Sequence, residues 1–238
     1  MGTGLLDEYR SEAEKVFGEN LVSLTVYGSH AAGEPGPGAE VSVLVVVREL
    51  RKETLSGFRN IAHRFARRGI PVPPIFTESF LKGSADVFPL KFLGMHSQRR
   101  VIAGKDVVAE LEITTGNLRH QVEFELKGKL LSLRRIYMGT FGNKESLGVL
   151  KDTVGPVVSV ARGLLLLADG EAPHGKPEIV AEIEMRFGVS LPSIKEALAA
   201  KRGAKIPAGK AEDLFLGYLE DVDRLCSLAD VYRAGPGK

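Results

Sequence analysis

A glycine, two serines and an acid lie close together in the first quarter of the chain. Gly28 and Ser29 follow a β-rich run, and Glu40 and Ser42 stand two residues apart at the start of the next apolar run. Backbone N–H groups after a glycine that opens a helix can hold phosphate oxygens. Side chains at i and i+2 of a strand point to one face, so acids there grip Mg²⁺ ions between them. Such a turn suits a phosphate, and of the two positions that share a face only Glu40 carries an acid.

The elements that must position these residues alternate in type through the first half of the chain. Strands are predicted over 21–27, 41–47 and 87–93, and amphipathic helices over 5–17 and 52–68. The second run, VSVLVVV, is apolar enough for a strand that is buried on both faces. This half is therefore predicted to be α/β.

Only helical patterns follow residue 114. Apolar residues between Leu118 and Tyr137 fall on one helical stripe. Further helices are predicted over 146–168, 177–187, 192–200 and 210–232. Pro156 is expected to kink or divide the first of these helices, because proline cannot donate the helical hydrogen bond. Four or five helices without a strand signal imply a helical bundle.

The Gly28-Ser29 pair, the loop after it and the acid at Glu40 resemble the nucleotidyltransferase superfamily, the polymerase-beta-like fold that kanamycin nucleotidyltransferase shares. The segments 74–80, 84–95 and 100–106, and the helix that begins near Arg119, are similar to one two-domain subgroup. The resemblance implies an α+β fold with two domains. A mixed β-sheet with flanking helices would occupy residues 1–113, and a C-terminal helical bundle, the substrate or partner domain, residues 114–238.

The resemblance also implies roles for particular side chains. The Gly-Ser pair of the family opens a short helix that holds the triphosphate, so Gly28, Ser29 and the adjacent His30 are candidate nucleotide-binding residues. Glu123 and Glu125 lie on the helix where related two-domain enzymes place a carboxylate that helps to deprotonate the acceptor hydroxyl. Most glutamates on an amphipathic helix are simply solvated, which is the alternative for these two.

The metal-binding positions of the family are where this sequence differs from it. The family has carboxylates at i and i+2 and a third on a neighbouring strand. Glu40 retains the first, but Ser42 stands at the second position and Lys91 at the third. A lysine 4 Å from a unit positive charge is repelled by roughly 4 kcal/mol at an effective dielectric of 20, and a divalent ion roughly doubles this. We hypothesise that Lys91 forms an ion pair with Glu40 in place of a metal. The alternative is that Lys91 points to solvent and another acid, such as Asp86, completes the site.

These substitutions predict a catalytically impaired nucleotidyltransferase-like protein that is retained for nucleotide or partner binding. No cofactor would be required, and Glu40 would be a metal ligand only if a metal binds. The first alternative is an active enzyme that uses Mg²⁺ and ATP to move a nucleoside monophosphate to a small-molecule or protein hydroxyl. The second alternative is a purely structural or regulatory interaction module.

The composition argues against several other classes. The 32 Lys and Arg residues nearly balance the 30 Asp and Glu residues, a formal net charge of +2 that disfavours a bulk nucleic-acid binder. The single cysteine cannot form an internal disulfide, and the five histidines lack metal-ligand spacing. Neither a membrane span nor the apolar core of a signal peptide is present. We therefore expect a cytoplasmic protein that binds a nucleoside triphosphate or a protein partner, and no membrane.

Overall fold

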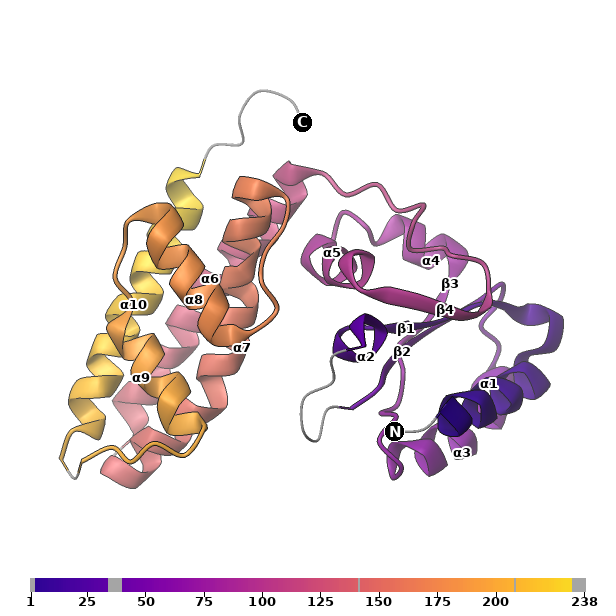
Figure 1. The fold of residues 1–238 in the computed structure, drawn as a ribbon, viewed down its shortest axis with the longest axis horizontal. Helices are drawn as coiled ribbons and strands as arrows, with labels where there is room; N and C mark the ends of the chain where they lie inside the picture. Colours follow the sequence, from indigo (N-terminus) through magenta and orange to yellow (C-terminus); the bar gives the residue numbers. More distant parts are fainter. Residues whose placement is uncertain (1–2, 34–39, 141, 208, 233–238) are drawn as a thin grey trace. The chain divides into compact units, whose positions relative to one another are not determined.

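The computed structural model describes residues 3–33, 40–140, 142–207 and 209–232 of the 238-residue chain. Most of the Gly- and Pro-rich loop between the first two strands lies outside these residues. The chain divides into two compact units, residues 1–113 and 114–238 (Figure 1). Strands occur in the first unit, and the described elements of the second unit are all helices. This α+β organisation confirms the predicted fold class.

Four strands form one mixed sheet in the first unit. They are β1 (Leu21–Tyr27), β2 (Ser42–Val47), β3 (Ile75–Thr77) and β4 (Arg99–Gly104), in the spatial order β3-β2-β1-β4. Strand β1 is antiparallel to both β2 and β4, whereas β3 is parallel to β2. The two strands at the centre of the sheet are therefore the two whose sequence runs are the most apolar.

Helices cover both faces of this sheet (Figure 1). They are α1 (Thr3–Phe17), α2 (Ser29–Ala32), α3 (Lys52–Ala66), α4 (Glu78–Gly83) and α5 (Pro89–Ser97), with a 3₁₀ turn, η1, at Gly18–Asn20. Val43, Val45 and Val47 of β2 pack in one buried cluster with α1 and α3. Leu44 and Val46 pack in a second cluster with α4 and α5. The continuous apolar run of β2 is thus explained by burial on both faces.

The predicted strand at 87–93 is wrong, because helix α5 begins at Pro89. Proline suits the first position of a helix, where its missing N–H needs no partner and its φ is already helical. Phe92 and Met95, three residues apart, are both buried in the cluster that covers the sheet. A short apolar run does not distinguish a strand from a buried helix. Strand β4, which follows α5, was not predicted.

Five helices make up the described elements of the second unit. They are α6 (Thr115–Gly139), α7 (Asn143–Asp169), α8 (Lys176–Phe187), α9 (Pro192–Lys201) and α10 (Ala211–Val231). Helices α6, α7 and α10 pack against one another, and α9 lies against α7 and α10. The predicted stripe of α6 is buried, from Leu118 to Leu133. Pro156 lies inside α7 but does not divide it, because Val154 and Val157 are buried beside it and their packing offsets one lost hydrogen bond. Within the described ranges, no helix is long and apolar enough to cross a membrane.

Candidate functional site

The chain leaves β1 through a turn that depends on glycine. Gly28 has φ 77° and ψ −157°, a backbone conformation that residues other than glycine adopt only with strain. Its N–H donates to the carbonyl of Gln98 at 3.0 Å, which ties the turn to the start of β4. Ser29, which is exposed, begins α2, and the half-buried His30 follows it. The N–H groups of Ala31 and Ala32 donate to the carbonyl of Gly28, so a phosphate at this turn would meet the N–H of Ser29.

Glu40 and Ser42 lie where the chain enters β2. Val41 and Val43, which alternate with them, are buried in the cluster of α1 and α3. The alternation therefore turns Ser42 to the opposite side, and Glu40 lies two residues before β2 begins. Glu40 is exposed and Ser42 is half-buried. The pairing of Ser42 with Tyr27 places it beside the strand end that leads into the glycine turn.

Three paired side chains, Ser42, Tyr27 and Arg99, cross the sheet at this end, and we call them the sheet-end row. Ser42 pairs with Tyr27, and Tyr27 pairs with Arg99 on its other side. Directly paired residues of antiparallel strands share a face. Burial raises the pKa of the Tyr27 phenol, and a hydrogen bond with the Ser42 side chain opposes that shift. The row thus presents a hydroxyl, a phenol and a guanidinium, and no carboxylate.

Arg99 is the cation of the sheet-end row, and its side chain is only 17% exposed. Its Nε lies 2.9 Å from each carboxylate oxygen of Asp106, and its Nη1 donates to the carbonyl of His96. The Arg99 guanidinium holds the pKa of Asp106 below its usual value. Sequence reasoning missed Arg99, because the pairing of β4 with β1 joins distant segments and leaves no local pattern. The available signal was the pair of arginines immediately before the apolar run 101–103.

Lys91 does not lie on a strand next to Ser42. It is exposed on α5, and its Nζ lies 5.7 Å from the centroid of the Phe76 ring, an attractive position for an ammonium group. Phe76 pairs with Val46, which is roughly 13 Å along β2 from Ser42 at about 3.3 Å per residue. Within the described residues, no ion pair joins Lys91 to Glu40. The hypothesis of an internal ion pair at the metal position is therefore wrong.

The residues at this end of the sheet do not fit a Mg²⁺ site. Strands β1, β2 and β3 carry no acidic residue, so Glu40 is the acid closest along the chain to Ser42. Among the residues that the structure describes, no group of three or more His, Cys, Asp or Glu side chains is arranged to hold a metal ion. Asp86, the alternative ligand, is exposed in the turn before α5. Because Mg²⁺ prefers several carboxylate and phosphate oxygens, one serine and one exposed glutamate supply too few donors.

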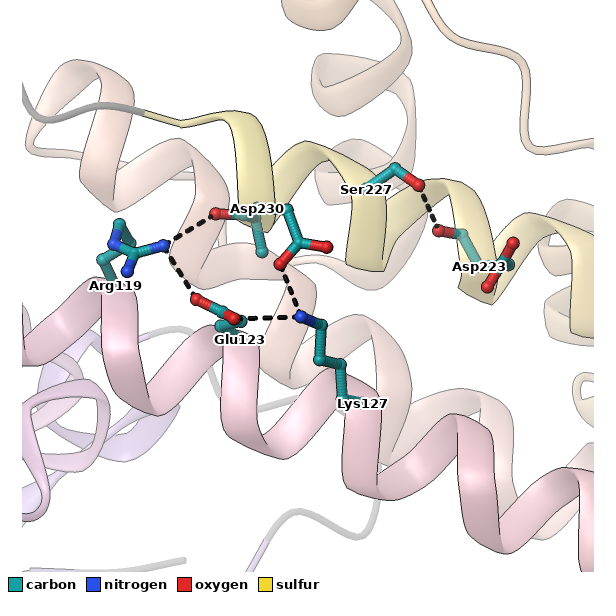
Figure 2. A network of polar contacts seen from close by, with 7 residues as sticks. Arg119, Glu123, Lys127, Asp223, Ser227 and Asp230 are labelled. Atoms are coloured by element: carbon teal, nitrogen blue, oxygen red, sulfur yellow. Dashed lines mark hydrogen bonds and ion pairs between the residues drawn. The ribbon is translucent and has the colours of Figure 1, made fainter.

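Glu123 and Glu125 lie on α6 in the second unit. Glu123 accepts hydrogen bonds from Arg119 at 2.7 Å and from Lys127 at 3.0 Å, and Lys127 also contacts Asp230 of α10 at 2.6 Å (Figure 2). We call these four residues the α6–α10 network. Each oxygen of Glu123 has a partner, and Glu125 accepts from Gln121 at 2.7 Å. These contacts favour a structural role for Glu123, in which it holds α6 against α10.

The chain is similar to two known proteins, one described as a putative adenylyltransferase and one as an adenyltransferase. No protein-family model matches the chain. A stretch of 82 residues is 32% identical to a curated protein of Methanocaldococcus jannaschii, "Putative protein adenylyltransferase MJ1305". This match covers 33% of the chain and 56% of that protein, so the chain spans about half the length of this relative.

A solved structure matches almost the whole chain. It is the crystal structure of spectinomycin adenyltransferase AAD(9) from Enterococcus faecialis with ATP and spectinomycin, and the TM-score is 0.62. The match covers 94% of this chain and 99% of that one at 14% sequence identity, so it speaks for the fold alone. The match shows that this chain has the α+β fold of that adenyltransferase, which agrees with the fold that the resemblance predicts.

Proposed function

We propose that this protein binds a nucleoside triphosphate at the glycine turn beside the sheet-end row, and that it does not carry out metal-dependent transfer of a nucleoside monophosphate. One observation carries the proposal. The chain leaves β1 through the positive-φ Gly28 and begins α2 at Ser29, whereas the three strands that meet at this turn, β1, β2 and β4, contain no carboxylate.

Metal-dependent transfer and phosphate binding depend on different groups of the site. A metal held by carboxylates neutralises phosphate charge and orients the attacking hydroxyl, so transfer depends on those acids. Backbone N–H groups hold phosphate oxygens without any metal. With Ser42 in place of a strand carboxylate, transfer should therefore be lost before binding. The relatives support the ligand class, because one is described as an adenylyltransferase and the other was solved with ATP.

Thermal unfolding with ATP, in EDTA and in excess Mg²⁺, tests the proposal. A ligand present at a hundred times its Kd stabilises the folded state by about 2.7 kcal/mol, which a thermal shift resolves. We expect the same rise in Tm in both buffers and no release of pyrophosphate in Mg²⁺. A rise only in Mg²⁺, with pyrophosphate release that Glu40→Ala abolishes, would instead identify an active transferase. No rise in either buffer would identify an interaction module and reject nucleotide binding.

A substitution that restores an acid sharpens this test. Ser42→Asp would place two carboxylates at i and i+2, with Glu40 as the first, the minimum arrangement for gripping a divalent cation. We expect ATP binding by this variant to become stronger in Mg²⁺ than in EDTA, by severalfold. Lys91→Glu is the matched control, because Lys91 lies on α5 beside Phe76. This variant should bind ATP equally well in Mg²⁺ and in EDTA. If Mg²⁺ changes the ATP affinity of the two variants equally, the placement of the ancestral metal site at Ser42 is rejected.

A further inference from the structure

We propose that Arg99 contacts the bound triphosphate directly and supplies the positive charge that a metal would otherwise bring. This inference rests on the proposed function, since it names the group that binds the phosphates in the absence of metal ligands. It concerns a residue that the sequence pattern of the site did not include.

The position of Arg99 places it next to the glycine turn. Arg99 pairs with Tyr27, the residue immediately before Gly28, and paired Cα atoms in antiparallel strands are about 4.5–5.5 Å apart. The carbonyl of Gln98, the residue before Arg99, accepts the hydrogen bond of the Gly28 N–H. Helix α2, which begins at the turn, contacts both β1 and β4. Two strand ends and one helix start therefore meet where Arg99 lies.

The guanidinium of Arg99 is oriented but not saturated. Asp106 holds Nε, and the carbonyl of His96 holds Nη1. Within the described part of the chain, Nη2 has no hydrogen-bond partner. A guanidinium has five N–H donors and pairs well with phosphate oxygens, so donors remain for a ligand. Because the side chain is already held and mostly buried, it loses little conformational freedom when it binds.

The neighbouring cations do not share this position. Arg100 pairs with Val26, whose side chain is buried in the cluster of α1 and α3, so Arg100 faces the other side of the sheet. It is also exposed and belongs to the same strand, which makes it a matched control for Arg99. Lys91 lies over Phe76 on α5. Asp106 is the nearest competing anion, and a triphosphate carries several more negative charges than one carboxylate.

Four proteins and one ligand test the inference. The Kd of ATP is measured in EDTA for the wild type and for Arg99→Gln, Arg100→Gln and Asp106→Asn, at one salt concentration. We expect Arg99→Gln to weaken binding about tenfold, the effect of one charge-assisted contact. Arg100→Gln should stay within about twofold of the wild type, because surface charges add little. Asp106→Asn should strengthen binding by about two- to fivefold, because it removes the competing negative charge from Arg99.

ATP affinity is expected to fall in Arg99→Gln and to rise in Asp106→Asn. These opposite changes distinguish a ligand contact from an ion pair that is only structural. If the pair only holds β4 to the following loop, Arg99→Gln and Asp106→Asn will weaken binding alike, in step with their loss of Tm, and the inference fails. If Arg99→Gln binds ATP as the wild type does, the inference also fails while the proposed function stands. If the wild type binds no ATP, the proposed function fails, and the inference fails with it.

A charge-conserving variant covers the case in which Arg99→Gln does not fold. Arg99→Lys keeps the positive charge at the same strand position but loses the planar fork that grips a carboxylate. We expect this variant to bind ATP within about threefold of the wild type. Added salt should lower its ATP affinity as much as it lowers that of the wild type. ATP binding that is lost in a folded Arg99→Lys variant and equally in Asp106→Asn would overturn the inference.

Discussion

The sheet-end row of the first unit and the α6–α10 network of the second are both built from polar and charged side chains, yet they are neutralised to different degrees. In the network, both oxygens of Glu123 have cationic partners, and Lys127 bridges to a further acid on the neighbouring helix (Figure 2). In the row, Arg99 retains a donor without a partner among the described residues. Charges that satisfy one another hold helices together. Charges left over beside a backbone turn are available to a ligand.

The largest expected effect is a loss of stability, when a buried carboxylate of the second unit is removed. The carboxylate of Asp221, whose side chain is 1% exposed, accepts from the N–H groups of Ser193 at 2.8 Å and Ile194 at 2.9 Å and from Arg224 at 2.6 Å. Asp221→Ala leaves these donors unpaired at the start of α9, which should cost about 3 kcal/mol of unfolding free energy. Urea unfolding followed by circular dichroism measures the loss. A cost below about 1 kcal/mol would show that the buried charges of this unit are dispensable.

A smaller loss of stability, with a clear loss of binding, is expected at the glycine turn of the first unit. Gly28→Ala forces a side chain into positive φ, which costs about 1–2 kcal/mol, and moves the N–H groups of the turn. ATP binding should weaken along with it. Gly94→Ala is the control, since Gly94 is inside α5 and a Cβ there meets no atom within 4 Å. That change should leave binding unaltered and stabilise the helix by up to about 1 kcal/mol. Equal effects of the two variants on ATP affinity would contradict the role of the turn.

The α6–α10 network should contribute to stability and not to ligand binding. Glu123→Gln removes the charge that Arg119 and Lys127 contact but keeps one acceptor oxygen. A partly exposed network of this kind contributes about 1 kcal/mol or less, which corresponds to a fall in Tm of about 2–4 °C at this chain length. ATP affinity should not change. Loss of ATP binding in Glu123→Gln without a matching fall in Tm would assign this residue to the ligand site after all.

The smallest effect is a dependence on pH in the first unit. Arg99 lowers the pKa of Asp106 in the folded protein, so the folded state binds a proton at this carboxylate less readily than the unfolded state does. The pair therefore stabilises the protein above the unfolded pKa, near 4, and this contribution disappears as the pH falls through the lowered folded pKa. The difference in Tm between the wild type and Asp106→Asn, followed from pH 6 down to acid, should shrink toward zero. A difference that grows as the pH falls would contradict the direction of the shift.

Much of the fold followed from local patterns in the sequence. The strand at Leu21–Tyr27 has the predicted bounds, and the apolar stripe from Leu118 to Leu133 is buried as its spacing indicated. The strand predicted across Pro89 failed, because a short run of mostly apolar residues suits a buried helix as well as a strand. Pro156 does not divide α7, one of the two outcomes predicted for it, because tertiary packing around this helix outweighs one missing hydrogen bond.

The candidate site was predictable in part, for a physical reason that lies in strand pairing. The glycine turn and the face of Ser42 follow from local sequence and from alternation along one strand. Lys91 was assigned by its place in a sequence pattern, and the structure puts it on a helix beside Phe76. Arg99 came into the site only through the pairing of β4 with β1.

The sequence by itself determined the residue types at the site: a glycine that can take positive φ, a single acid, and a serine where a second acid would be expected. These are properties of individual side chains and of local periodicity, and no tertiary contact changes them. Only the tertiary structure decided which cation stands beside the turn. Strand order and register depend on contacts between segments far apart in the chain, and those contacts set Arg99, not Lys91, in the row with Tyr27 and Ser42.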